Sequence, residues 1–202
     1  MVSQRPRTSA SVKGNAVPGR RWFAKLSALA RLFPDARIIC CVRHVPWIID
    51  SMERLAQQNP LEPSRIFAFD PAGTVYTRYE MLAGVSGLVG YAWNALRQAF
   101  YGEQRGRLML LTYETLATNP ARARAAVYQF IGAPAYAHDF ADVKLDTADF
   151  DSRLGAPGLH KLRPTVSFQR RDTILPPDLF DRIAKDSFWV EQIAASRGIP
   201  II

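Results

Sequence analysis

Hydrophobic and polar residues along this chain form segments whose spacing alternates between that of a helix and that of a buried strand. Residues 21–33 place apolar side chains at helical intervals and Pro34 ends the pattern, so a first helix is predicted there. Residues 37–42 follow as a short apolar run rich in β-branched side chains, which predicts a strand buried on both faces. Pro46 then opens a second helical pattern, because proline is tolerated in the first turn of a helix.

The middle of the chain repeats this order of elements. Residues 78–101 have the spacing of one long helix, although they contain Gly84, Gly87 and Gly90. Each glycine inside a helix costs about 1 kcal/mol relative to alanine, so three of them predict the close approach of another backbone. Residues 107–112 then predict a second buried strand.

The last part of the chain begins with a helix and continues with a long irregular stretch. Asn119 and Pro120 suit the cap and the first position of that helix, and Gly132 ends it. Residues 133–176 are rich in Pro, Gly, Asp and Arg, and loops of that length are usually functional or disordered. A last helix is predicted after them. The alternation of strands and helices predicts the α/β class with a parallel sheet.

Length and composition suit one globular domain of 202 residues, of which 48% are hydrophobic. No apolar run approaches the roughly 18 residues of a membrane helix, so we expect no membrane span and a cytoplasmic location. Cys40 and Cys41 are adjacent in one apolar run and match no zinc or redox spacing, so both are interpreted as small core residues. The histidines His44, His138 and His160 are scattered, and no metal site is predicted.

The charge of the chain is strongly positive and unevenly placed. Lys and Arg number 26 against 18 Asp and Glu, a net charge of +8, which favours nucleic acid, a membrane surface, or a phosphorylated or sulfated ligand as partner. Residues 1–18 are basic, contain no acidic residue and bury little apolar area. We therefore expect 1–18 to be a disordered tail and 19–202 to form the domain.

Residues 33–55, FPDARIICCVRHVPWIIDSMERL, carry the most informative pattern. The predicted strand ends on Arg43, and Ser51 lies about two turns into the helix that follows. Ligands bind at the carboxyl ends of parallel strands, where helix N-termini attract anions. An arginine there can bind phosphate through two charge-assisted hydrogen bonds. The pair predicts a two-point phosphate clamp. The spacing alone leaves open that Arg43 is a solvated turn residue and Ser51 a small helix residue.

Three blocks resemble the sulfotransferases that use PAPS, 3′-phosphoadenosine 5′-phosphosulfate. Residues 33–55 resemble the region that binds the 3′-phosphate. Residues 107–132, RLMLLTYETLATNPARARAAVYQFIG, resemble a block in which "YE-x-L…NP" precedes a helix. Residues 158–182, GLHKLRPTVSFQRRDTILPPDLFDRI, look like the C-terminal block of a bacterial sulfotransferase subfamily. The chain also resembles protein-tyrosine sulfotransferases, and the likeness spans roughly residues 20–195.

The resemblance implies a fold, a reaction and a set of binding residues. The fold is a three-layer αβα sandwich with a parallel sheet, like that of P-loop nucleotide kinases. The reaction is transfer of a sulfuryl group from PAPS to an acceptor hydroxyl or amine, with PAP as product and no metal. Arg43 and Ser51 would contact the 3′-phosphate, Tyr113 the adenine side, and Arg170 and Arg171 would lie in the loop over the nucleotide.

The sequence departs from the family in its N-terminal part. Relatives begin with a strand and a "PRSGTT"-like phosphate loop, which this sequence lacks, and SVKGNAVPG replaces the strand before Trp22 that often carries a catalytic base. His44 stands where relatives more often have Asp or Asn. We therefore expect a family member that is truncated at its N-terminus, with Met1 encoded by a late start codon. Its activity is expected to be doubtful, and no catalytic base is identified.

Two other functions remain open at this stage. A non-catalytic module would bind PAP, PAPS or a peptide without turnover. A nucleic-acid-binding protein would use the basic tail, but the absence of interleaved aromatic residues before Trp22 disfavours this reading. With two clear strands, the sheet is expected to expose an edge, which predicts a homo-oligomer or poor solubility. The small-molecule or protein acceptor is not predicted.

Overall fold

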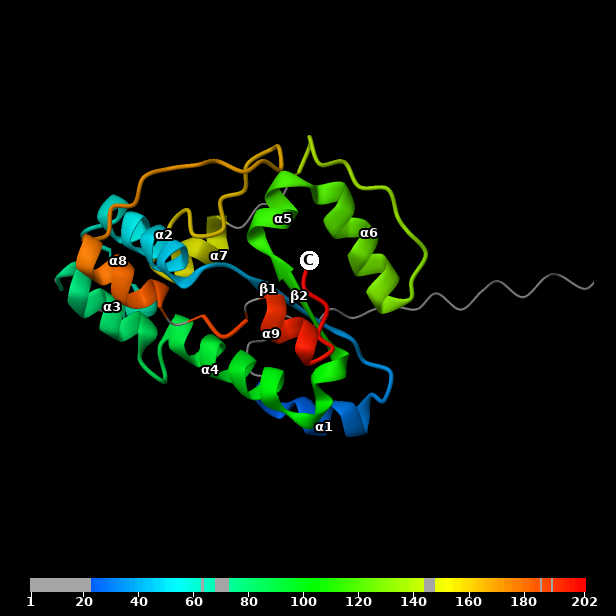
Figure 1. Ribbon diagram of the computed structural model, residues 1–202. Coiled ribbons are helices and arrows are strands. Elements are labelled where there is room, and N and C mark those ends of the chain that lie inside the picture. The colour runs from blue at the N-terminus through cyan, green and yellow to red at the C-terminus, as the bar shows by residue number, and fades with distance from the viewer. Residues whose placement is uncertain (1–22, 63, 68–72, 144–147, 186, 190) are drawn as a thin grey trace, which may run out of the picture.

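The computed structural model describes residues 23–202 except 63, 68–72, 144–147, 186 and 190 (Figure 1). The predicted tail, residues 1–18, lies outside the described residues, so the division of the chain into tail and domain stays a prediction. The elements in chain order are η1 (Phe23–Lys25), α1 (Leu26–Leu32), β1 (Ile38–Val42), α2 (Val45–Gln58), η2 (Arg65–Phe67), α3 (Val75–Ala83), α4 (Leu88–Tyr101), η3 (Glu103–Arg107), β2 (Leu108–Thr112), α5 (Tyr113–Thr118), α6 (Pro120–Ile131), α7 (Ala148–Arg153), α8 (Pro177–Ala184) and α9 (Glu191–Ser196).

The two predicted strands pair in parallel at the centre of the molecule (Figure 1). Ile38 lies opposite Leu108, and Val42 opposite Thr112. The C-terminal residues extend the sheet beyond β2, because Leu110 N donates to Pro200 O at 2.8 Å and Ile202 N donates to Leu110 O at 3.0 Å. The α/β class with a parallel sheet is confirmed, and the three-layer arrangement like that of P-loop kinases stays a prediction.

Two hydrophobic clusters hold the elements together. The first joins the sheet to α1, α4 and the C-terminal segment around the fully buried Phe100, Leu108 and Leu110. The second joins α2, α3 and α8 around Ile49, Leu82, Leu179 and Ile183. Trp93 and Trp189 pack against both clusters, and their ring centres are 4.6 Å apart. The aromatic pair therefore connects the helices that hold the candidate site to the sheet.

The first strand is buried on one face only, which corrects the expectation of two buried faces and of a core position for Cys41, whereas Cys40 is a core residue as predicted. Cys40 and Val42 are 4% and 5% exposed, as core residues are, whereas Cys41 between them is exposed. Successive side chains of a strand point to opposite faces, so an apolar sequence can still leave one face uncovered. In contrast, Leu108 to Leu111 of β2 are all buried, as predicted.

The single long helix expected over residues 78–101 is wrong. The chain forms α3 and α4, separated by a turn over residues 84–87 in which Gly84 ends α3 and Gly87 precedes α4. The expected close approach of another backbone is confirmed. A Cβ atom on Gly87 would overlap the carbonyl oxygens of Met81 and Leu82, and one on Gly90 would overlap those of Ala83 and Gly84. The glycines thus permit a bend that the hydrophobic spacing does not reveal.

We expect Gly90→Ala to lower the free energy of unfolding by about 1–3 kcal/mol, because a methyl group forced against two backbone carbonyls cannot be relieved by a side-chain rotation. This range is the net change, after the gain of about 1 kcal/mol that alanine offers in a helix is subtracted from the cost of the clash. Chemical denaturation followed by circular dichroism measures it. Gly106→Ala is the matched control, because its Cβ would meet nothing within 4 Å. Equal stability of both variants would contradict the close-packed bend.

Three predicted helix ends agree with the structure, but the single last helix expected after Pro176 is wrong. The helix α8 ends at Ala184, Phe188 and Trp189 lie outside any helix, and α9 follows as a separate helix. Pro46 lies in the first turn of α2. Asn119 caps α6 by accepting from Arg122 N at 3.1 Å, and Gly132 ends this helix with φ of 68°. The long stretch 133–176 contains one short helix, α7, among its described residues. None of the helices in the described part of the chain is long and apolar enough to cross a membrane.

Candidate functional site

The carboxyl ends of the two strands meet at one edge of the sheet. Because Val42 pairs with Thr112, the next residues, Arg43 and Tyr113, lie side by side. The Arg43 guanidinium carbon is 4.1 Å from the centre of the Tyr113 ring, a cation–π contact. Two residues predicted to bind one nucleotide, 70 positions apart in the chain, are therefore neighbours at the edge where α/β proteins bind ligands.

Arg43 is a partly buried cation that lacks a complete set of partners. Its Nε is buried and has no hydrogen-bond partner among the described residues. Burial lowers the pKa of the guanidinium and the nearby Arg171 adds to this effect, while Tyr113, Glu114 and Asp50 oppose it. Arginine stays charged even so. A charged donor without an acceptor is an unfavourable arrangement that an anion at this edge would relieve.

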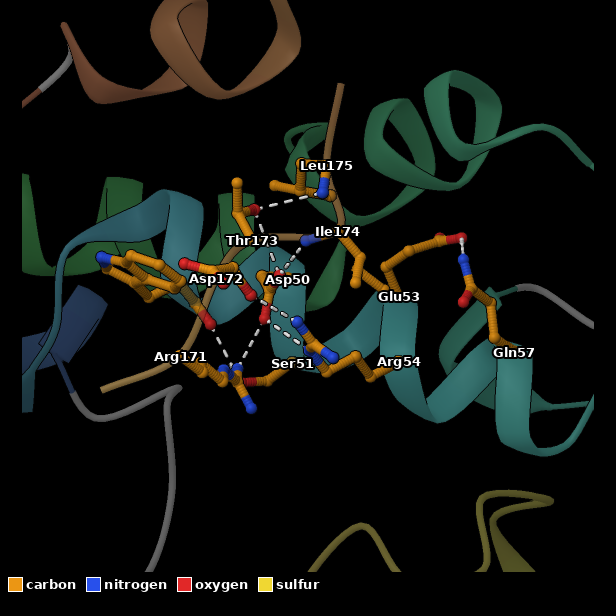
Figure 2. Close-up of polar contacts among 11 residues, drawn as sticks. Asp50, Ser51, Glu53, Arg54, Gln57, Arg171, Asp172, Thr173, Ile174 and Leu175 are labelled. Carbon is orange, nitrogen blue, oxygen red and sulfur yellow. Dashed lines mark hydrogen bonds and ion pairs between the residues drawn. The ribbon is translucent and has the colours of Figure 1, made fainter. Parts of the chain in front are cut away.

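Ser51 and Arg171 meet on the side of α2. The Arg171 Nη2 donates to Ser51 Oγ at 2.7 Å (Figure 2). The same hydroxyl donates to Trp47 O at 2.9 Å. Like Arg43, Arg171 has a buried Nε with no partner in the described part of the chain. The structure thus brings an arginine of the loop to the predicted serine of the helix.

Asp50 organises these contacts, and the sequence interpretation missed it. The side chain is fully buried, lies 2.6 Å from Arg171 Nη2 and accepts from Arg54 Nε at 3.0 Å. It also accepts from the backbone N–H of Ile174 at 2.8 Å. Figure 2 shows Asp50 between the two arginines and residues 173–174 of the loop. The sequence could have indicated Asp50, because this carboxylate follows Ile49 on the buried face of α2, but it does not reveal the partners of Asp50.

The electrostatics of Asp50 follow from this network. Burial alone would raise the pKa of the carboxyl group, but the Ile174 N–H, Arg54 and Arg171 together hold the pKa below its usual range. The group is therefore a carboxylate in the folded protein at neutral pH. It fixes the segment 171–175 against α2 and sets the position of the Arg171 fork.

The loop that carries Arg171 also covers Tyr113. The ring centres of Phe168 and Tyr113 are 6.3 Å apart. Arg170 is exposed, and no contact ties it to the other four predicted residues in the described structure. Arg43, Ser51, Tyr113 and Arg171 thus form one cluster, which we call the arginine cluster, and Arg170 lies outside it.

A large cavity opens beside β1 and borders the arginine cluster. Its volume is about 1090 Å³, and Arg43 is part of its wall. The exposed Cys41 lies on the same wall, which explains why that face of the strand is uncovered. Most of the lining is apolar, with contributions from Ile48, Met52, Leu88, Trp93, Phe150 and Leu159. In the described residues no three His, Cys, Asp or Glu side chains gather as a metal ion would require.

The comparison with known families defines the class of protein. The sulfotransferase family model matches residues 20–138, more than half of the chain. The chain therefore belongs to the sulfotransferase family. The match includes Arg43, Ser51 and Tyr113 and ends before Arg171. No curated protein and no solved structure matches the chain.

Proposed function

We propose that this chain binds PAPS and its product PAP at the arginine cluster and transfers the sulfuryl group to an acceptor hydroxyl or amine. The observation that carries the proposal is the pair of buried Nε–H donors on Arg43 and Arg171, both without a partner among the described residues. Two guanidinium groups that each keep an unpaired Nε–H near the carboxyl edge of a parallel sheet suit a phosphate group. Membership of the sulfotransferase family supports the same ligand.

The arginine cluster and its charged neighbours together carry a net positive charge, which favours an anion. Arg43, Arg54 and Arg171 face the carboxylates of Asp50 and Glu114. The Ser51 hydroxyl, now bonded to Trp47 O, can rotate to donate to a phosphate oxygen. Arg43, Arg171 and Ser51 would hold the 3′-phosphate, with Tyr113 on the adenosine side. PAPS brings an activated sulfuryl group, while the cluster anchors the nucleotide and orients it toward the cavity.

A non-catalytic binding module is the second candidate, because the sequence contains no "PRSGTT"-like motif for the phosphosulfate end. Both candidates require nucleotide binding and differ in turnover. Calorimetric titration with PAP and with ATP tests the first requirement, since ATP lacks the 3′-phosphate and carries a 5′-triphosphate in place of the 5′-monophosphate of PAP. A transfer assay with radiolabelled PAPS and a panel of phenols and amines tests the second. PAP binding no tighter than ATP binding would refute the proposed site.

A further inference from the structure

His160 and Asp151 form a hydrogen-bonded pair on the wall of the cavity. Asp151, on α7, is 3% exposed at its side chain, and its Oδ1 lies 2.6 Å from His160 Nδ1. The second oxygen, Oδ2, accepts from the His160 backbone N–H at 2.9 Å. One buried carboxylate therefore holds both the imidazole ring and the backbone that carries it.

This geometry fixes which imidazole nitrogen can accept a proton. A carboxylate accepts hydrogen bonds, so Nδ1 carries the proton that it donates to Asp151, and the lone pair is on Nε2. The His160 side chain is 45% exposed and lines the cavity. No group of the described structure hydrogen-bonds to Nε2. The nitrogen remote from Asp151 is thus available to a molecule in the cavity.

The other ionisable groups on the cavity wall are poorly suited to accept a proton. Among its described lining residues are no Asp and no Glu. Burial raises the pKa of the Cys40 thiol to about 12 and also raises that of Cys41, so both stay protonated. Arg43 and Arg65 are permanent cations, and Tyr91 carries a weakly acidic phenol. Imidazole is the lining group best suited to act as a base at neutral pH.

Residues 1–37 contain one acidic residue and no histidine. The first acidic residue is Asp35, and no histidine precedes His44. His44 lies next to Arg43, but its ring packs 6.4 Å from that of Phe180 and it is not among the cavity-lining residues. In the described structure, the loop after α7 places the His160 imidazole on the cavity wall, where it can accept a proton from a bound acceptor.

We propose that His160, oriented by Asp151, is the general base of this sulfotransferase and acts on an apolar phenol or alcohol bound in the cavity. This inference rests on the proposed function. His160 Nε2 takes the hydroxyl proton while the acceptor oxygen forms a bond to the sulfur of PAPS. The bond from sulfur to the 5′-phosphate oxygen breaks, and its electron pair leaves on PAP. The imidazolium then releases its proton to water.

The roles of the neighbouring groups follow from the contacts. Asp151 is a positioning residue, because it touches His160 and not the acceptor, and its charge stabilises the imidazolium that forms. Arg65, whose backbone N–H donates to Leu154 O, is a cationic residue of the same cavity wall. The apolar lining favours an uncharged, hydrophobic acceptor and keeps water from competing with it.

The experiment compares the wild-type chain with His160→Ala and His160→Gln, using radiolabelled PAPS and 2-naphthol as the acceptor probe. Loss of a general base lowers the rate typically 10²–10⁴-fold, so we expect kcat to fall by that order while PAP affinity stays unchanged. Added imidazole should restore part of the rate of His160→Ala. His138→Ala is the matched control, since His138 contacts Tyr128 outside the cavity.

The pH profile separates a base from a structural residue. In the wild-type chain we expect kcat/KM to fall toward acidic pH as the base becomes protonated, and this fall should be absent in His160→Gln. Asp151→Asn should weaken catalysis and alter the same limb of the profile. Thermal melting of each variant shows whether it is folded. The His160 variants are expected to disturb folding less than Asp151→Asn, because the His160 side chain is 45% exposed and that of Asp151 is buried.

Each outcome bears on the proposal. Full activity of folded His160→Ala and His160→Gln would overturn it. PAP binding by a wild-type chain that transfers no sulfate would also overturn it, while the nucleotide site would stand. A wild-type chain that neither binds PAP nor transfers sulfate would end the proposed function and this inference with it.

Discussion

Arg43→Ala is expected to weaken PAP binding roughly 10- to 100-fold, which corresponds to the 1.5–3 kcal/mol typical of a hydrogen bond to a charged group. The guanidinium lies at the carboxyl edge of β1 with a buried, unpaired Nε, so the nucleotide would gain a donor that needs no rearrangement. Calorimetric titration with PAP measures the effect. ATP affinity should change much less, because ATP lacks the 3′-phosphate.

Two further variants distinguish charge from geometry at this position. Arg43→Lys keeps the charge but loses the planar fork, so we expect an affinity between those of the wild type and the alanine variant. Arg97→Ala removes an exposed arginine of α4 and should leave PAP affinity unchanged. If Arg97→Ala and Arg43→Ala weakened binding equally, the effect would be one of net charge, and a specific clamp would be excluded.

Asp50→Ala is expected to lower the free energy of unfolding by about 3–5 kcal/mol, the usual cost of removing one partner of a buried ion pair. The fully buried carboxylate accepts from Arg54 and from Ile174 N and pairs with Arg171, so its loss leaves two cations without their partner. Denaturant titration measures the change. The loop segment 171–175 should also become accessible to protease, because Asp50 ties it to α2.

An exposed ion pair gives the matched control for Asp50. Glu80 and Arg182 lie 3.4 Å apart with side chains 68% and 56% exposed, so Glu80→Gln should cost less than about 1 kcal/mol. A loss at Asp50 no greater than that at Glu80 would mean that the network contributes little to folding. It would also remove the reason to assign Asp50 a role in holding Arg171.

The same carboxylate predicts a dependence of stability on pH. The pKa of Asp50 in the folded protein lies below its usual range, so the unfolded chain binds a proton at higher pH than the folded one. Its contribution is present above the unfolded value of about 3.9 and is lost as the pH falls through the folded-state pKa. Asp50→Asn should therefore show a flatter decline of stability with acid than the wild type. Parallel acid curves for the two proteins would contradict this assignment.

The sequence predicts an exposed sheet edge, and the structure shows that the edge of β2 is covered. Residues Pro200 to Ile202 cover the outer edge of β2, and in the described structure β1 has no strand partner other than β2. Self-association through the free edge therefore stays a prediction. A sizing column run over a range of protein concentrations tests it, and a monomer at all concentrations would contradict it.

The sequence by itself determined the elements whose cause is local. An apolar run predicts a buried strand. The helix ends marked by Pro46, Asn119 and Gly132 depend on the backbone chemistry of single residues. Arg43 and Ser51 could be proposed as a pair because they lie on one strand–helix unit. Tyr113 entered through the resemblance, and the strand register then explains why it lies beside Arg43.

Only the tertiary structure decided the contacts made between distant segments. The loop that carries Arg171 crosses α2, although Arg171 and Ser51 are 120 positions apart in the chain. This crossing buries Asp50, pairs it with Arg171 and leaves Arg170 outside the arginine cluster. The pairing of His160 with Asp151 and the uncovered face of Cys41 likewise depend on what packs nearby. The spacing of residues predicts the periodicity of one helix or strand. A site between elements depends on how distant segments pack together, which the pattern of one segment does not reveal.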